Sequence, residues 1–280
     1  MKIGICCIIK MENLYLRDFV EYYKNIGVSN IVLYDNNDES GEYPQQVIGD
    51  YISNGFVIYE NVRGKYRYQL ESYSACYKKY KETFDWLGFF DADEFLSMDN
   101  GIGINSLLSD SKYKDADIIP VYWVSYGDSG LLHYDGRPVY ERFTVAENME
   151  KNETNTFKLF IRCRKYLTVN FVDANAITFY STGGRVRSFL SSGDEIDISS
   201  DFYKIWSYKN MHLNHYHTLT IEEFLYRRFG RRSYADKASS YSKENIMGIF
   251  WQFCEKTVEK EKIIDDFFKT FEIKEDLAKP

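Results

Sequence analysis

The sequence predicts an α/β fold: a mostly parallel, Rossmann-like central sheet with helices on both faces. Over roughly the first 95 residues, apolar runs typical of buried strands alternate with stretches of helical periodicity. Strands that alternate with helices in this way form parallel sheets. Two acidic clusters follow the second and the fourth run, at the sheet edge where such folds bind their ligands.

The first strand is expected over residues 2–9, a nearly continuous apolar run that suits a strand covered on both faces. Asn13 is the expected N-cap of the helix that follows, and Gly27 is expected to end it. The later elements of this part are strands at 30–34, 56–59 and 86–90, a helix from near Pro44 and a helix from about Arg67 to Thr83.

Beyond residue 115 the pattern changes to short strand-like runs separated by polar turns, which predicts antiparallel additions to the sheet. Helical spacing returns towards the C-terminus and predicts a helical part there. The expected strands are 118–124, 139–143, 157–161 and 176–180, and the expected helices are 220–231 and 243–270.

Charge and cysteine content narrow the class of protein. The 280 residues carry 35 Lys and Arg against 42 Asp and Glu, a net charge of −7, so a nucleic-acid partner is not expected. Five scattered cysteines without a CxxC motif favour a reducing compartment. The apolar N-terminus is too short to span a membrane. We therefore expect a cytoplasmic protein, at most peripheral at the inner membrane face.

The triplet Asp91-Ala92-Asp93 directly follows the fourth predicted strand. On an extended backbone, residues i and i+2 point to the same side, so both carboxylates would face one cation. Oxygen ligands favour Mg²⁺ or Mn²⁺, which keep positions open for water and substrate phosphates. A solvated acidic turn is the alternative, and the place of the triplet after a buried strand favours the metal site.

A second polar cluster joins Lys10 and Glu12 after the first strand to Asp35 and Asn36 after the second. A carboxylate and an amide at a strand end can hold a base or a ribose. A helix cap and a polar turn would use the same residues, and this alternative stays open. The sequence has neither a GxGxxG motif nor a P-loop, so it does not indicate a dinucleotide fold or a P-loop enzyme.

Three of the four histidines, His212, His215 and His217, lie within six residues. Histidine can complete a Mn²⁺ shell or lie beside a phosphate. These three cannot all face one way on a strand, and clustered histidines also arise from packing. On an extended strand His215 and His217 share one side and His212 faces away, so His215 and His217 compete for any role at the sheet edge. A metal-binding role and a packing role both stay open for them at this point.

Three other features admit a functional and a structural interpretation. Asp128, in a loop between two glycines, could act as a base or could simply belong to a tight turn. The four arginines in residues 227–232 could clamp a phosphate, form a solvated helix face or meet an anionic membrane. The apolar residues at helical spacing near the C-terminus suit either an interfacial helix or packing on the main domain. They are Ile246, Ile249, Phe250 and Phe253.

Together these motifs resemble GT-A-fold glycosyltransferases of a family-2-like group related to family 92, formerly a domain of unknown function. The resemblance spans roughly residues 3–232. Two blocks in this order are specific, Trp86 to Leu96 and Asn214 to Phe224. The other matching segments are Lys10-Met11-Glu12-Asn13, Phe19 to Tyr23, Val32 to Asn36, Gln69, Cys76, Trp123 and Glu141-Arg142-Phe143.

The resemblance implies transfer of a sugar from a nucleotide-sugar donor on a GT-A fold with Mn²⁺ or Mg²⁺. Asp91 and Asp93 match the metal-binding DxD motif, and His215 matches a histidine that can be a third metal ligand. Asp35 matches an acidic residue near the nucleotide. The remaining residues implied at the nucleotide-sugar are Lys10, Glu12, Asn36, Gln69 and Ala92.

The chain departs from its relatives at two places. Met11 stands where many relatives have Asn, and residues 169–173 lack a histidine that relatives often carry, which leaves the acceptor open. The implied catalytic domain covers residues 1–240, with a helical extension over 241–280 packed on it.

The implied reaction is an inverting transfer in which a carboxylate deprotonates the acceptor hydroxyl. Glu94, Asp128 and Glu147 are the candidate bases. We expect a hexosyltransferase that uses a UDP-sugar and a saccharide or glycolipid acceptor in cell-surface polysaccharide or glycoconjugate synthesis. A metal-dependent nucleotidyltransferase or phosphoesterase, and a non-catalytic carbohydrate-binding relative, are the alternatives.

Overall fold

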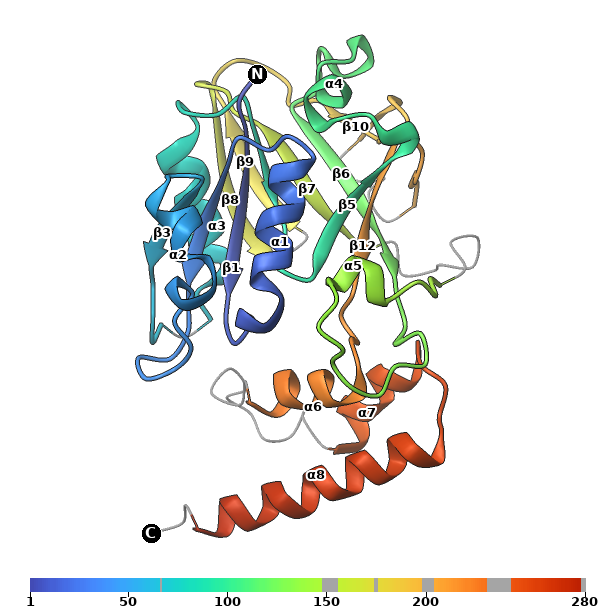
Figure 1. Ribbon diagram of the computed structural model, residues 1–280. Coiled ribbons are helices and arrows are strands. Elements are labelled where there is room, and N and C mark those ends of the chain that lie inside the picture. The colour runs from blue at the N-terminus through green and yellow to red at the C-terminus, as the bar shows by residue number, and fades with distance from the viewer. Residues whose placement is uncertain (66, 148–155, 174–175, 198–203, 231–242, 278–280) are drawn as a thin grey trace. The chain divides into compact units, whose positions relative to one another are not determined.

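A computed structural model describes residues 1–65, 67–147, 156–173, 176–197, 204–230 and 243–277 (Figure 1). The chain forms two compact units. The first unit consists of residues 1–124 and 149–215, and the second of residues 125–148 and 216–280. The domain boundary expected between residues 240 and 241 lies outside the described residues.

Four parallel strands form the centre of the first unit, in the order β3-β2-β1-β4. The chain visits them alternately with helices, so the predicted α/β alternation is confirmed. All seven residues of β1 are buried, as the continuous apolar run predicts for a strand covered on both faces. The strands are β1 (Ile3–Ile9), β2 (Asn30–Asp35), β3 (Val57–Asn61) and β4 (Trp86–Phe89).

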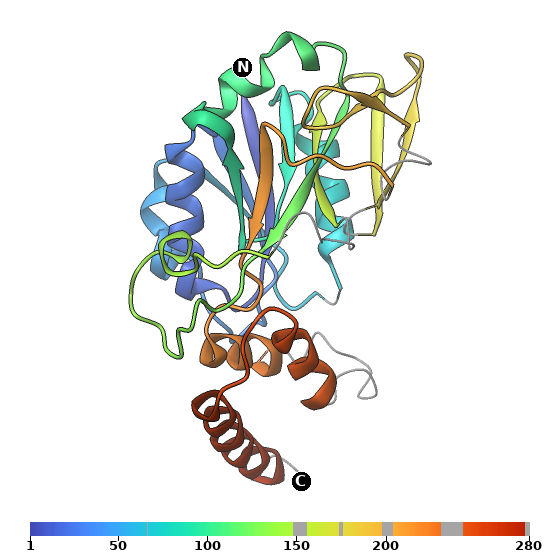
Figure 2. The same ribbon diagram turned by 90° about the vertical axis from the view of Figure 1, so that its right-hand side faces the viewer.

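Helices cover both faces of these strands, as Figure 2 shows: α1 and α2 lie on one side and α3 on the other. The strand order explains this arrangement, because the connection from β3 to β4 reverses the direction in which strands are added and right-handed crossovers then change face. The helices are α1 (Asn13–Asn25), α2 (Gln45–Ser53) and α3 (Gln69–Tyr80).

The two ends of α1 test the cap assignments. Gly27 follows the last turn with φ +95°, a left-handed conformation that glycine adopts without strain. Asn13, however, is the first helical residue and not the N-cap: Glu12 takes that position without a side-chain cap bond. Glu42 Oε2 instead accepts the Asn13 N–H at 2.9 Å, so a distant carboxylate satisfies this helix start.

Antiparallel strands extend the sheet beyond β4, as predicted. β7 (Phe157–Arg162) pairs with β4 and with β6 (Ile118–Ser125). The short β10 (Ser188–Phe189), which pairs with β6 in parallel, and β11 (Glu195–Ile196) complete this edge. β12 pairs with β6 and, in antiparallel fashion, with β5, so both belong to the same sheet, whereas β8 and β9 form a separate antiparallel pair. Their bounds are β5 (Glu94–Met98), β12 (Met211–His215), β8 (Leu167–Asp173) and β9 (Ala176–Ser181). Between β5 and β6 lie α4 (Ile104–Leu108) and two 3₁₀ turns, η1 (Asp99–Gly101) and η2 (Ser111–Tyr113).

The predicted strand at 139–143 is wrong: Val139–Arg142 forms the short helix α5. The Pro138 carbonyl accepts the N–H groups of Glu141 and Arg142, which closes helical turns directly after the proline. Val139 and Phe143 are both buried and lie four residues apart, a spacing that serves one face of a helix. Alternation along a strand also places residues i and i+4 on one face, so this spacing does not separate a helix from a strand.

The helices of the second unit share a small apolar core. Phe224 of α6 (Ile221–Gly230) packs on Phe250 of α7 (Lys243–Trp251) with ring centroids 5.0 Å apart. The helix expected over 243–270 is in fact α7 and α8 (Val258–Leu277). Phe250 is therefore a core residue, whereas Ile249 is 38% exposed. None of the helices described here is long and apolar enough to cross a membrane.

Candidate active site

The parallel strands bring the predicted polar clusters to one edge of the sheet. β1 and β2 end together, with Ile9 opposite Asp35, and Phe89 at the end of β4 lies opposite Cys6 of β1, so the residues that follow Phe89 run on to the same edge. The Asp91-Ala92-Asp93 triplet and the polar turn after β2 are therefore at the carboxyl edge, where a doubly wound sheet binds ligands. This placement follows from the strand order of the first unit alone.

Asp91 is held by donors from two elements. Its Oδ1 accepts hydrogen bonds from Gln69 Nε2 at 2.9 Å and from the Tyr73 hydroxyl at 2.8 Å. Gln69 and Tyr73 lie four residues apart in α3 and so share one helix face. Lys158 Nζ of β7 contacts Oδ2 at 2.8 Å. The Asp91 side chain is still 29% exposed, so an anchored carboxylate faces solvent.

Glu94 and Ala92 are buried beneath this edge. Ala92 has no exposed surface, and Glu94, the first residue of β5, accepts the Asp91 N–H at 2.9 Å. Burial raises the pKa of Glu94 well above its ordinary value, and the nearby Lys158 opposes that shift. Glu94 therefore supports the turn from inside, which is a poor position for a base that must reach an acceptor.

Asp93 and His215 face each other at the same edge. In the pairing of β12 with β5, His215 lies opposite Glu94, the residue after Asp93. His215 Nε2 and Asp93 Oδ2 are 3.8 Å apart, too far for a hydrogen bond. The His215 ring lies against Trp123, with ring centroids 4.1 Å apart.

Asp93 and His215 fit a divalent ion that keeps positions for water and phosphate, because a carboxylate oxygen and an imidazole nitrogen both suit Mn²⁺. Across the described residues, no group of three or more His, Cys, Asp or Glu side chains converges as a metal site. Asp91 Oδ2 contacts a lysine at this edge, and its Oδ1 accepts from Gln69 and Tyr73.

The other two histidines lie elsewhere. In β12 the side chains alternate, so His212 is on the opposite side from His215, as the sequence predicts. Burial lowers the pKa of His212. His217 belongs to the second unit, where its ring packs against Phe253 with centroids 4.6 Å apart.

The turn after β2 is tied to its own surroundings. Asp35 is fully buried and accepts hydrogen bonds from Arg63 Nη1 at 2.8 Å and the Tyr59 hydroxyl at 2.7 Å. Asn36 donates to the carbonyls of Val62 and Lys65, at 3.0 and 2.8 Å.

The residues after β1 are also bonded within the first unit. Lys10 Nζ pairs with Asp38 Oδ1 at 2.7 Å, and Glu12 Oε1 accepts from the Tyr15 hydroxyl at 3.1 Å. The contacts of Lys10, Glu12, Asp35 and Asn36 are thus those of a polar turn and a helix start, the structural alternative that the sequence left open.

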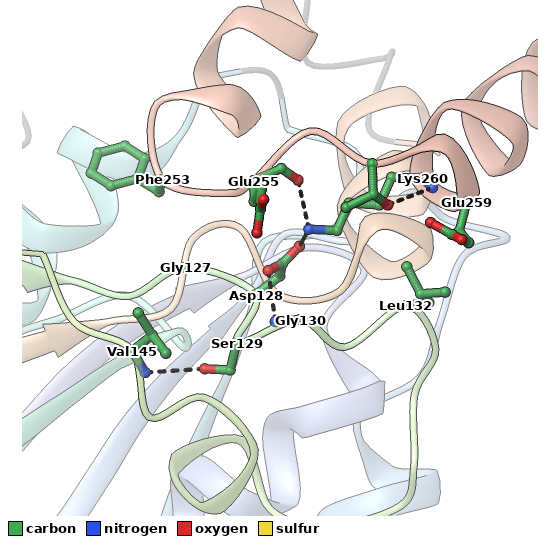
Figure 3. A pocket seen from close by; sticks show the side chains of 11 residues that line it. Gly127, Asp128, Ser129, Gly130, Leu132, Val145, Phe253, Glu255, Glu259 and Lys260 are labelled. Carbon is green, nitrogen blue, oxygen red and sulfur yellow. Dashed lines mark hydrogen bonds and ion pairs between the residues drawn. The ribbon is translucent and has the colours of Figure 1, made fainter.

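The two remaining base candidates lie in the second unit. Asp128 is buried, and its carboxylate contacts Lys260 Nζ at 2.5 Å and accepts the Gly130 N–H at 2.9 Å, as Figure 3 shows. Glu147 Oε1 accepts the Ser125 N–H at 2.6 Å. Glu94, by contrast, belongs to the first unit.

In the arginine cluster, Arg227 is buried and Arg228 lies over the Phe224 ring at 5.4 Å. Arg231 and Arg232 lie outside the described residues.

Sequence reasoning missed Arg63, Tyr73 and Lys158. Of these, only Lys158 left a local signal: it is the one charged residue in the apolar run Phe157 to Ile161. A lysine at such a position is buried only with a partner, which indicates an ion pair but not its identity.

A doubly wound sheet with an acidic strand end defines a class of proteins that bind ligands at the carboxyl edge. Residues 3–225 match the sequence model of glycosyltransferase family 92, and the chain belongs to this family. The predicted family relationship is therefore confirmed.

Two plant proteins of family 92 illustrate the sequence likeness. One from Ricinus communis is 27% identical over 156 residues, which cover 55% of this chain and 28% of that protein. Another from Arabidopsis thaliana is 27% identical over 160 residues, with 54% and 28% covered. The chain thus matches just over a quarter of the length of these relatives.

Two solved structures are similar at low identity. S. aureus TarS 1–349 in complex with UDP has a TM-score of 0.40 at 10% identity, covering 58% of this chain and 47% of that chain. A mannosyltransferase from Pyrobaculum calidifontis, in complex with GDP-Man and Mn²⁺, has a TM-score of 0.35 at 9% identity, covering 57% and 44%.

Proposed function

We propose that the protein is a metal-dependent, inverting hexosyltransferase that moves a sugar from a UDP-sugar to a hydroxyl of a saccharide or glycolipid acceptor. The observation that carries this proposal is the acidic edge itself: an anchored, partly exposed Asp91 beside the facing Asp93 and His215. Membership of family 92 supplies the reaction class. A role in cell-surface polysaccharide or glycoconjugate synthesis belongs to the same proposal.

The residues of the edge have separate tasks in this proposal. Asp93 and His215 would hold Mn²⁺ or Mg²⁺, which when bound supplies positive charge to the departing diphosphate. Asp91 is an acceptor for donor hydroxyls, and its three partners fix its orientation before the donor arrives. Trp123 beside His215 presents an aromatic face that suits a sugar or a base.

Ligand-dependent melting tests the proposal. A nucleoside diphosphate and Mn²⁺ together should raise the melting temperature more than either alone, because both bind only the folded protein. UDP should give the largest rise in a panel with GDP, ADP and CDP. A panel in which no nucleotide shifts the melting temperature, with or without Mn²⁺, would contradict donor binding.

A product assay separates the proposal from its alternatives. With a UDP-sugar and a mixture of saccharide acceptors, a glycosyltransferase releases UDP in proportion to a new glycoside. A nucleotidyltransferase or phosphoesterase would release pyrophosphate or phosphate from nucleotide substrates instead. A non-catalytic relative would bind the donor and release nothing.

The cellular location that we propose is the cytoplasm, with peripheral contact at the inner membrane face. All five cysteines are unpaired, which suits a reducing compartment. Flotation of the full chain with anionic liposomes tests the membrane part. Co-migration that is lost at high salt supports the contact, and absence of co-migration contradicts it.

A further inference from the structure

Lys158 lies where the antiparallel part of the sheet meets the acidic strand end. It is the second residue of β7, and its neighbour Leu159 pairs with Phe89, the last residue of β4. Because β7 is antiparallel to β4, Lys158 lies beyond the end of β4, beside the turn that carries Asp91. The register therefore brings a cation to this edge from a distant part of the sequence.

The ammonium of Lys158 is enclosed. Its side chain is 1% exposed, and the rings of Trp123 and Tyr73 lie 5.7 and 6.0 Å from Nζ. Its anionic neighbours are Asp91 Oδ2 at 2.8 Å and Glu94 Oε1 at 3.8 Å. A side chain so enclosed does not reach a substrate, so its effect on a ligand must pass through these carboxylates.

Electrostatics gives this arrangement a consequence. Three acidic side chains, Asp91, Asp93 and Glu94, occupy four consecutive positions, and negative charge gathered in this way attracts cations. A buried ammonium is unfavourable unless a carboxylate lies beside it, so Lys158 needs the negative charge of Asp91 to remain buried and charged. A cation that bound Asp91 Oδ2 would have to displace Lys158, leaving an ammonium with no route to solvent.

We propose that Lys158 is a built-in counter-ion that keeps divalent cations off Asp91, so that a cation at this edge is restricted to Asp93 and His215. The inference rests on the proposed function only in the choice of Mn²⁺ as the cation. Lys158 is thus a positioning residue. It holds Asp91 as a hydrogen-bond acceptor and limits cation binding at the acidic edge to Asp93 and His215.

Titration of the nucleotide-free full chain with MnCl₂, followed by calorimetry, tests the proposal. Lys158→Met retains the length of the side chain and removes its charge, which frees Asp91 Oδ2. Mn²⁺ should then bind at least about tenfold more tightly, because the positive charge that lies 2.8 Å from Asp91 Oδ2 is lost. The melting temperature without metal should fall, and Mn²⁺ should restore it in the variant more than in the parent.

Lys165→Met is the matched control, because Lys165 follows β7 and is 87% exposed, with Glu82 at 3.7 Å. It should leave both Mn²⁺ affinity and melting temperature unchanged. Lys158→Arg keeps the positive charge and should keep the Mn²⁺ affinity of the parent. In the double variant Lys158→Met with Asp91→Asn, the gain in affinity should disappear, because Asp91 is the group that the extra cation binds.

Unchanged or weaker Mn²⁺ binding by a folded Lys158→Met variant would overturn the proposal. If that variant does not fold, Mn²⁺ titrations of Asp91→Asn and Asp93→Asn in saturating UDP test the proposal instead. The proposal expects Asp91→Asn to bind Mn²⁺ within about twofold of the parent and Asp93→Asn at least about tenfold more weakly. Equal losses in both variants would overturn it.

Failure of this proposal and failure of the proposed function give different results. The titration without nucleotide reports only on the carboxylates and Lys158. A parent that binds no nucleotide sugar would refute the donor, while tighter Mn²⁺ binding by Lys158→Met would still support the role of Lys158.

Discussion

Two buried lysine–aspartate pairs, one in each unit, use the same chemistry for different ends. Lys158 and Asp91 lie 2.8 Å apart in the first unit, and Lys260 and Asp128 lie 2.5 Å apart in the second. Both lysines are almost fully buried. The aspartates differ: the side chain of Asp91 is 29% exposed and that of Asp128 only 5%.

The surroundings of the two aspartates explain that difference. Asp91 lies two residues after the end of β4 and takes its other hydrogen bonds from side chains of α3. Its side chain keeps 29% of its surface exposed. Asp128 accepts the N–H of Gly130 in its own loop, while Lys260 donates to the Glu255 carbonyl at 2.8 Å. The second pair therefore joins a loop to the first turn of α8, and the bond to Glu255 joins that turn to the segment before it.

Gly127 shows how tightly that loop is fastened. A Cβ atom at this position would lie 2.2 Å from the Phe253 carbonyl oxygen, so only glycine allows the approach. Ion pairing thus does not distinguish a functional carboxylate from a structural one. What distinguishes the two is whether the paired carboxylate remains exposed at a strand end. Four predictions follow from this comparison.

The largest expected effect is on the stability of the second unit. Lys260→Met leaves Asp128 buried without its cation, and loss of one partner of a buried pair costs about 3–5 kcal/mol. Lys256→Met is the control: Lys256 is 63% exposed and pairs with Glu261, a contact worth less than about 1 kcal/mol. Urea unfolding measures both values. Equal, small losses would show that the Lys260 pair is not structural.

Asp93→Asn should have the next largest effect, this time on activity. If Asp93 holds the cation, its loss should lower kcat by about 10²–10³-fold, the usual cost of removing one charge-stabilising group. The melting temperature without ligands should change little, and its rise with UDP and Mn²⁺ should disappear. Asp50→Asn, at a 57% exposed position, is the control. A variant that keeps full turnover would remove Asp93 from the site.

The sequence predicts the parallel half of the molecule well because its evidence is local. A continuous apolar run reveals β1, and direct succession to β4 places Asp91 and Asp93 at the carboxyl edge. Lys158 and Arg63 escape prediction, because their partners are fixed by strand register and loop packing across many residues. Asp128 is a candidate base from the sequence because its partner Lys260 lies 132 positions later, and no residue near Asp128 indicates that pairing.

His215→Ala should have a smaller effect than Asp93→Asn, because a neutral ligand is lost and a charge is not. Mn²⁺ affinity in the presence of UDP should fall by about 10–100-fold. Imidazole favours Mn²⁺ over Mg²⁺, so the preference of the activity for Mn²⁺ should also shrink. His212→Ala, on the other side of β12, should retain both properties. Equal behaviour of the two variants would exclude His215 as a ligand.

The smallest expected effect concerns His212 and pH. Burial lowers the pKa of His212, although Asp99 and hydrogen bonds with Asn214 and Tyr208 oppose the shift. In the unfolded chain its pKa is about 6.5. Below that pH the unfolded chain binds a proton more readily than the folded chain does. The stability that neutral His212 provides is therefore complete above about pH 6.5 and is lost as the pH falls towards the lower pKa of the folded state.

His212→Gln cannot titrate and should flatten the loss of stability between about pH 7.5 and 5.5. Urea midpoints of the parent and the variant over this range measure the two slopes. If the slopes coincide, burial of His212 does not contribute to acid sensitivity, and the groups at the carboxyl edge become the ones to test.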